Sequence, residues 1–222
     1  MAWTCDYHLD INTQQNYWAA NVGNLSECNA PLFRYIESLA GAGAETADKV
    51  YGCEGWVAHT VANVWNFTAP GWSTGWGLHP TGGAWLATHI WDYYCFTKDE
   101  IFLLKTYPVL KQAALFFLDY MTEDPETGYL VTGPSNSPEN SFAWNGKQFS
   151  TSMMPTCDRV IVHELLNACL HIAELLQLDE EFRGRVIAAI DRLPPFKIGK
   201  YGQIQEWQED YEEAIPNHRH TS

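Results

Sequence analysis

One carboxyl group stands in a constrained loop near the middle of the chain. The stretch "LVTGPSNSPENSF", residues 130–142, holds Glu139 between Pro138 and Asn140. Its content of Gly, Pro and Ser predicts neither helix nor strand. Pro138 restricts the backbone, and neighbouring Ser and Asn side chains can hydrogen-bond the carboxyl group. A carboxyl group kept protonated there could protonate the leaving oxygen of a glycosidic bond, whereas the alternative is an ordinary solvated glutamate.

A second group of polar side chains lies near the N-terminus, in "YHLDINTQQNYW". His8, Asp10 and Asn12 alternate there with Leu9 and Ile11. In an extended stretch, alternating side chains point to opposite sides. We therefore expect the three polar residues to form one wall of a pocket; the alternative is a loop whose polar side meets water.

The end of the chain carries two further polar stretches. In "NHRHTS", residues 217–222, Arg219 lies between His218 and His220 and could clamp sugar hydroxyl groups. His-x-His also suggests a metal, but no acidic or Cys partner lies at a usual ligand spacing, so we expect no metal site. The acidic stretch "EWQEDYEE", residues 206–213, is interpreted as solvated surface rather than a catalytic pair.

Aromatic residues are abundant, with 10 Trp, 11 Tyr and 10 Phe making 14% of the chain. Trp76 and Trp85 lie in the Gly-rich stretch "GWSTGWGLHPTGGAWLATHIWDYY". Flat apolar rings with a polar edge suit the C–H faces of sugars, so we expect a carbohydrate platform there. A Trp-rich core is the alternative.

The charge distribution narrows the choice of partner. The net charge is −14, with 13 Lys+Arg against 27 Asp+Glu and no basic cluster, so nucleic acid and anionic membranes are poor partners. No run of about 18 apolar residues is present, which predicts no membrane insertion. The cysteines have no zinc-site spacing and are predicted to be free, buried thiols: Cys5, Cys28, Cys53, Cys95, Cys157 and Cys169.

Apolar residues recur with helical spacing in about six segments. These segments cover residues 13–24, 29–52, 81–97, 107–121, 158–179 and 180–193. Pro108 is expected to open the fourth of them. The long intervening loops, 52–83, 124–157 and 194–222, are rich in Gly, Trp, Pro and Asn and are expected to carry function, and "QIQEW" could be a short strand.

This succession of helices and functional loops predicts an all-α fold, an α/α toroid. Six helices would fill only half of a twelve-helix barrel. We therefore expect residues 1–222 to be the N-terminal part of a larger domain.

Several stretches together resemble one enzyme family. They are "HLDINTQQNYW", "GWVAH", "WGLHPTGGAWL", "YPVLKQAALFFLDYM", "GPSNSPEN" and "EWQED" with "HRHTS". Their order resembles the catalytic domain of family 95 glycoside hydrolases, the α-L-fucosidases, across nearly the whole chain. The resemblance implies an (α/α)6 barrel (six-hairpin toroid), no cofactor, and inverting hydrolysis of 1,2-linked α-L-fucosides in a fucosylated oligosaccharide or glycan. It favours a secreted or periplasmic protein, although this segment opens without a signal peptide.

The resemblance also implies roles for individual residues. The Glu of the "SPEN" motif is Glu139, the general acid, and the water-positioning amide of the family matches Asn12. Asp10 stands where the family usually has another Asn, and we interpret it as a tolerated variant. The positions implied to line the sugar subsite are His8, Arg219 and His220.

One element of the family pattern is not found in these residues. The Asp that activates the amide belongs to a "QIDGNFG"-like motif that follows the His-Arg-His stretch in the family. Asp210 is a substitute by type only, since its motif does not match. We expect the isolated segment to have weak activity or none. The alternatives left open are an α-L-galactosidase of the same family, a non-catalytic carbohydrate-binding relative, and a helical protein scaffold.

Overall fold

The computed structural model describes residues 6–216 and 218–219. The chain is mostly helical, as the sequence predicts. Six long helices and the one-turn helix α3 are described: α1 (Asn12–Val22), α2 (Ala30–Thr46), α3 (Thr74–Gly77), α4 (Gly82–Thr97), α5 (Glu100–Tyr120), α6 (Thr156–Leu175) and α7 (Glu180–Ile190). A 3-10 turn, η2 (Ser26–Asn29), precedes α2, and a π-helical turn, η3 (Ala47–Tyr51), extends it.

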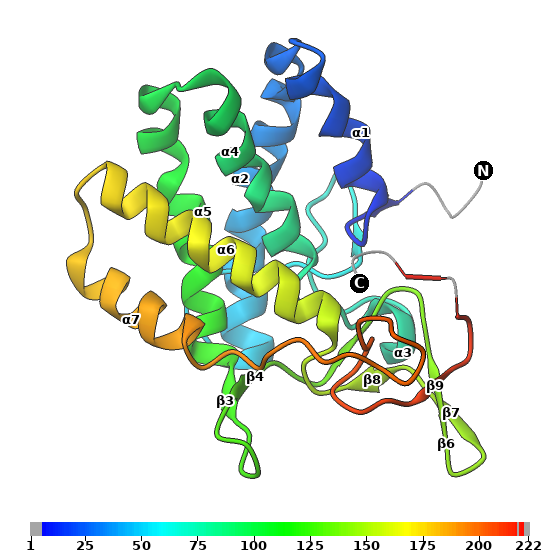
Figure 1. Ribbon diagram of the computed structural model, residues 1–222. Helices are drawn as coiled ribbons and strands as arrows, with labels where there is room; N and C mark the ends of the chain where they lie inside the picture. Colours follow the sequence, from blue (N-terminus) through cyan, green and yellow to red (C-terminus); the bar gives the residue numbers. More distant parts are fainter. Residues whose placement is uncertain (1–5, 217, 220–222) are drawn as a thin grey trace.

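The helices pack around α4 and α5, which contact each other (Figure 1). α6 contacts both of them, α7 contacts α6, and α1 and α2 contact α4. The apolar stripe of α5 shows why: Leu103, Leu110, Ala114 and Phe117 recur at helical spacing and are all buried. Each such large side chain removed from water contributes about 1.5–3 kcal/mol, so this face fixes the helix in the core.

The short strands pair antiparallel within the loops. β1 (Tyr7–His8) pairs with β2 (Val61–Ala62), β3 (Thr122–Glu123) with β4 (Leu130–Val131), and β5 (Ser135–Asn136) with β8 (Thr151–Ser152). β6 (Phe142–Trp144) lies between β7 (Lys147–Phe149) and β9 (Glu212–Glu213). Figure 1 shows α3 and β6 to β9 gathered at one end of the helices.

Two expectations about strands need correction. Residues 130–142 were expected to hold no strand, yet they contain β4, β5 and the start of β6. Each pairs with a partner strand, and this pairing gives hydrogen-bond partners to the backbone N–H and C=O groups of this Gly- and Pro-containing stretch. The expected strand "QIQEW" is reduced to a single bridge between Ile198 and Ile204.

Helix α5 also begins earlier than predicted. It starts at Glu100, and the Asp99 carboxylate accepts a hydrogen bond from Phe102 N at 2.9 Å. Pro108 therefore lies inside the helix rather than at its start, because the Asp99 N-cap provides a start signal more than two helical turns before the proline. By length and composition α5 could cross a membrane, with a mean hydropathy of 1.4. It packs against α4 and α6, and the absence of membrane insertion stays a prediction.

The predicted state of the cysteines is confirmed in part. None of the five described cysteines is in a disulfide; Cys157 and Cys169 are buried, Cys53 is half-buried, and Cys28 and Cys95 are exposed. The expectation of burial is wrong for Cys28 and Cys95, because the first lies in a surface turn and the second on the solvent face of α4. Cys5 lies outside the described residues.

Candidate active site

Glu139 lies on the loop between β5 and β6, and its side chain is 37% exposed. One carboxylate oxygen, Oε1, accepts a hydrogen bond from the Trp76 indole Nε1 at 3.3 Å. The other, Oε2, lies 3.5 Å from the imidazole Nε2 of His218. The carboxyl group is therefore held between two ring systems from distant parts of the chain, unlike an ordinary solvated glutamate.

A pocket of about 420 Å³ opens beside this carboxyl group. It is lined by Trp76, the loop residues 136–141, the strand end 148–150, and Ser73 and Gly75. Most of these side chains carry hydroxyl, amide or carboxyl groups, which hydrogen-bond sugars. The volume lies within the range typical of small-ligand sites.

A glycine next to Trp76 allows the chain to fold tightly enough to bring the indole to Glu139. A Cβ added at Gly77 would lie 1.6 Å from the backbone oxygen of Gly71. No larger residue fits unless the backbone moves, so Gly77 is a steric requirement of this turn.

The N-terminal polar stretch does not form the extended wall that its alternation predicts. Only Tyr7–His8 is strand; the next three residues turn, and α1 begins at Asn12. Leu9 and Asp10 are both completely buried, whereas Asn12 is exposed. Gln14 Nε2 donates to Leu9 O at 2.8 Å and closes the turn, so side chains no longer alternate between two faces. The catalytic roles given to Asp10 and Asn12 stay predictions.

His8 nevertheless joins the Glu139 site. Its ring lies 5.3 Å from the Trp76 ring, centroid to centroid, at 75°. Its Nε2 is buried and has no hydrogen-bond partner among the described residues. His8, Trp76 and Glu139 are thus contiguous, although His8 is not among the residues that line the pocket. The predicted role of His8 in sugar binding remains untested by this contact.

The C-terminal polar stretches fold onto the same loop. Arg219 Nε lies 3.1 Å from Glu206 Oε2, and the guanidinium also pairs with Glu213. The hydroxyl group of Ser137, two residues before the candidate acid, donates a hydrogen bond to Glu206 Oε1. The interpretation of residues 206–213 as solvated surface is wrong for Glu206, which is 2% exposed, because Arg219 supplies its counter-charge.

His218 is a contact that the sequence analysis did not assign to Glu139. In the sequence, the only sign of this contact is that His218 lies in the same motif as Arg219. The role of Arg219 in binding sugar hydroxyl groups stays a prediction. His220 lies outside the described residues. Asp210 accepts a hydrogen bond from the backbone N of Lys200 at 2.7 Å, so its carboxylate is engaged in a turn.

Trp85 is not among the residues that line the Glu139 pocket. It is half-buried on α4, packs against the core, and lies 6.5 Å from Trp18 between ring centroids. These surroundings fit the core alternative, and sugar stacking by Trp85 stays a prediction. Trp76, by contrast, contacts the candidate acid directly.

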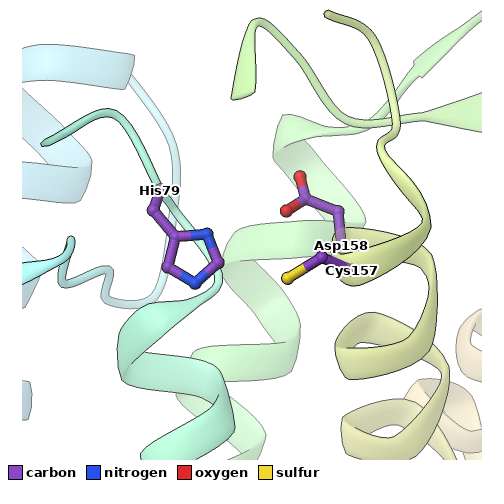
Figure 2. Close-up of side chains that lie close together, drawn as sticks. All are labelled: His79, Cys157 and Asp158. Atoms are coloured by element: carbon purple, nitrogen blue, oxygen red, sulfur yellow. The ribbon is translucent and has the colours of Figure 1, made fainter. Parts of the chain in front are cut away.

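A second polar cluster is completely buried behind the site. Figure 2 shows the side chains of His79, Cys157 and Asp158 close together, from the segment before α4 and the first turn of α6. The Asp158 carboxylate accepts hydrogen bonds from three hydroxyl groups. They belong to Thr132 at 2.6 Å, and to Thr81 and Ser135 at 3.1 Å each.

Burial raises the pKa of Asp158 to about 6, and the three hydroxyl donors oppose that rise. One ligand atom from each of His79, Cys157 and Asp158 lies within 4.8 Å of the others, a spacing that a metal ion could bridge. Because the carboxylate already accepts three hydroxyl groups, we interpret the cluster as a structural network. That the protein needs no metal stays a prediction.

Comparison with known proteins gives the family. Residues 1–222 match the glycosyl hydrolase family 95 catalytic domain. The chain is 43% identical to Alpha-L-fucosidase 2 of Arabidopsis thaliana, over 99% of this chain and 26% of that protein. It is 35% identical to Probable alpha-fucosidase A of Aspergillus niger, over 100% of this chain and 28% of that protein. The chain spans about a quarter of the length of these relatives. It belongs to the glycosyl hydrolase family 95 catalytic-domain family.

Proposed function

We propose that the protein containing this chain is an inverting α-L-fucosidase that hydrolyses 1,2-linked α-L-fucosides of oligosaccharides or glycans. The observation that carries the proposal is the Glu139 carboxyl group, held between Trp76 and His218 at a polar pocket. The names of the two relatives support the choice of sugar.

In this mechanism Glu139 donates its proton to the glycosidic oxygen while the bond from that oxygen to the anomeric carbon breaks. A water molecule attacks the anomeric carbon from the opposite face and loses a proton, so the configuration inverts. Asn12, exposed at the start of α1, holds this water, with Asp10 in the turn behind it. The two sides of the site are expected to stand about 6.5–9.5 Å apart, which leaves room for the water.

Other groups bind the sugar in this proposal. His8 offers its Nε2 to a hydroxyl group, Trp76 and Trp85 offer ring faces, and Arg219 and His220 complete the subsite. An amide such as Asn12 cannot accept a proton as a carboxylate does. The proposal therefore needs an aspartate outside the motifs found in residues 1–222 to polarise it.

We also propose that the long helices are part of an (α/α)6 barrel and that residues 1–222 are part of that catalytic domain. Contacts between consecutive helices α4 to α7 support this arrangement. The share of the relatives that the chain covers supports it as well.

The test is hydrolysis of 2′-fucosyllactose by the full-length protein that contains this chain, followed by proton NMR from the first minutes. We expect free L-fucose that forms first as the β-anomer, because inversion of an α-fucoside gives that product. Residues 1–222 alone serve as the comparison and are expected to release little or no fucose.

Three results would contradict the proposal. Initial release of the α-anomer would exclude inversion. Release of sugar from an α-L-galactoside but not from the fucoside would identify the C6 hydroxyl as the preferred feature and make the protein an α-L-galactosidase. Binding of 2′-fucosyllactose without turnover would favour the non-catalytic relative.

A further inference from the structure

We propose that Glu206, Glu213 and Arg219 position the candidate proton donor by holding both sides of its loop. We call these three residues the acid-loop clamp. The inference rests on the proposed function, since it concerns how Glu139 is aimed at the leaving oxygen. These residues act on Glu139 through others: Glu206 through Ser137, Glu213 through Asn140, and Arg219 through both carboxylates.

The first arm of the clamp holds the loop before Glu139. The Ser137 hydroxyl donates to Glu206 Oε1, across 69 residues of sequence. The other oxygen of that carboxylate lies 3.1 Å from Arg219 Nε. The backbone of Glu206 is fixed as well, because its carbonyl accepts a hydrogen bond from Thr156 N at 2.9 Å, at the start of α6.

The second arm holds the loop after Glu139. Asn140 Nδ2 donates to Glu213 Oε2 at 3.1 Å, and Arg219 pairs with both oxygens of the same carboxylate. Strand β9, which contains Glu213, pairs with β6 directly after the loop. The side-chain oxygen Oδ1 of Asn140 in turn accepts a hydrogen bond from Ile215 N at 3.3 Å.

Arg219 joins the two arms because a guanidinium group offers several donors in a fixed plane. Its side chain is 17% exposed, and its remaining donor NH1 binds the backbone oxygen of Ile204 at 3.1 Å. Hydrogen bonding to Glu213 raises the pKa of Arg219 above its usual value, so the group stays charged. A buried carboxylate such as Glu206 needs this charge, since without it the ionised form is strongly disfavoured.

Clamping matters for a proton donor because its reach is short. A misplacement of about 1 Å at a catalytic group can cost about 10²-fold in rate. Ser137 and Asn140 stand two residues before and one residue after Glu139, so together they restrict where its carboxyl group can lie. The clamp thus fixes the acid against the pocket from outside the reacting centre.

The decisive variant is Glu206→Gln in the full-length protein that contains this chain. Glutamine keeps the shape and can still accept from Ser137, but its amide N–H then faces the donor Nε of Arg219. The matched control is Glu212→Gln, which removes an exposed carboxylate of β9 that pairs with Lys200. Both variants are assayed on 2′-fucosyllactose and on α-L-fucosyl fluoride.

The two substrates separate positioning from folding. Fluoride leaves as an ion and needs no proton. The lactose that leaves from 2′-fucosyllactose must receive a proton from the acid. We expect Glu206→Gln to lower kcat on 2′-fucosyllactose by about tenfold or more, with KM within about twofold. On the fluoride its kcat should stay within about threefold, and Glu212→Gln should stay within about twofold on both substrates.

Equal losses on both substrates, or no loss on either, would overturn the inference. If Glu206→Gln does not fold, Glu213→Gln decides by the same criterion, because Glu213 lies nearer the surface. A wild-type protein that cleaves neither substrate would instead refute the proposed function.

Discussion

Glu139 and Asp158 are two carboxyl groups whose surroundings differ completely. Asp158 is fully buried and accepts hydrogen bonds from hydroxyl groups, one of them on Ser135. Glu139, four residues after Ser135, is partly exposed at a pocket and meets an indole and an imidazole. The first carboxyl group is enclosed by the protein, and the second is left accessible to a ligand.

The contrast teaches that residue type does not decide the use of a carboxyl group. Hydroxyl donors keep Asp158 in place, and burial raises its pKa to about 6 against their opposing effect. Glu139 keeps one side open to the pocket, as a group that exchanges a proton with a substrate must. Four substitutions, given in order of decreasing expected effect, test whether Asp158 acts on stability and the Glu139 site on catalysis.

Replacement of Glu139 by glutamine should abolish most turnover and leave stability unchanged. Loss of a general acid lowers kcat by about 10²–10⁴-fold, because the leaving oxygen then departs without a proton. The measurements are turnover of 2′-fucosyllactose by the full-length protein and its unfolding in urea. Glu126→Gln, at an exposed glutamate in the turn between β3 and β4, is the control and should leave turnover unchanged. Activity of Glu139→Gln equal to that of the control would refute the assignment.

Replacement of Asp158 by alanine should do the reverse and act on stability. Three hydroxyl groups lose their common acceptor in a buried site, so the free energy of unfolding should fall by about 3–5 kcal/mol. Urea unfolding measures the change, with the exposed Asp191→Ala as the control. A loss within about 1 kcal/mol of the control would contradict a structural role for the Asp158 network.

The pH dependence of stability should reveal the same carboxyl group. Because the pKa of Asp158 is raised to about 6 in the folded chain, the folded state holds its proton more tightly than the unfolded state. The stabilisation from this proton is fully present below about pH 4 and is lost as the pH rises through about 6. Over that window it amounts to about 3 kcal/mol.

Urea unfolding between pH 4 and pH 7 measures this dependence in the wild type and in Asp158→Asn. Asparagine cannot titrate, so the difference in unfolding free energy between the two proteins should change across the window. A difference that stays constant with pH would show that Asp158 does not titrate as described.

The smallest effect is expected at the indole that touches Glu139. Trp76→Phe removes the N–H donor at 3.3 Å and keeps an aromatic ring beside His8. Loss of one hydrogen bond to a carboxyl group should lower kcat by about 3–10-fold. Trp65→Phe is the control, since Trp65 is 86% exposed. Unchanged kcat in Trp76→Phe would mean that the indole does not hold the acid.

The sequence by itself determined the helical core and singled out the loop that holds the candidate acid. Periodic apolar residues located the long helices to within a few residues, except that α5 begins at Glu100 instead of near Pro108. Such periodicity is a local property, because the side chains that share one helix face lie three or four residues apart. The motif around Glu139 was local too, and it is one of the several stretches that together carried the family resemblance.

Only the tertiary structure decided which charged residues are buried and which distant groups meet. Nothing local distinguishes Glu206 from the exposed Glu209 and Glu212 near it, yet Glu206 is buried beside Ser137. The partners of Asp158 likewise come from two separate segments, one before α4 with Thr81 and one running from β4 into β5 with Thr132 and Ser135. Burial of a charge depends on donors supplied by segments far apart in sequence, and no short-range pattern records which of them will meet.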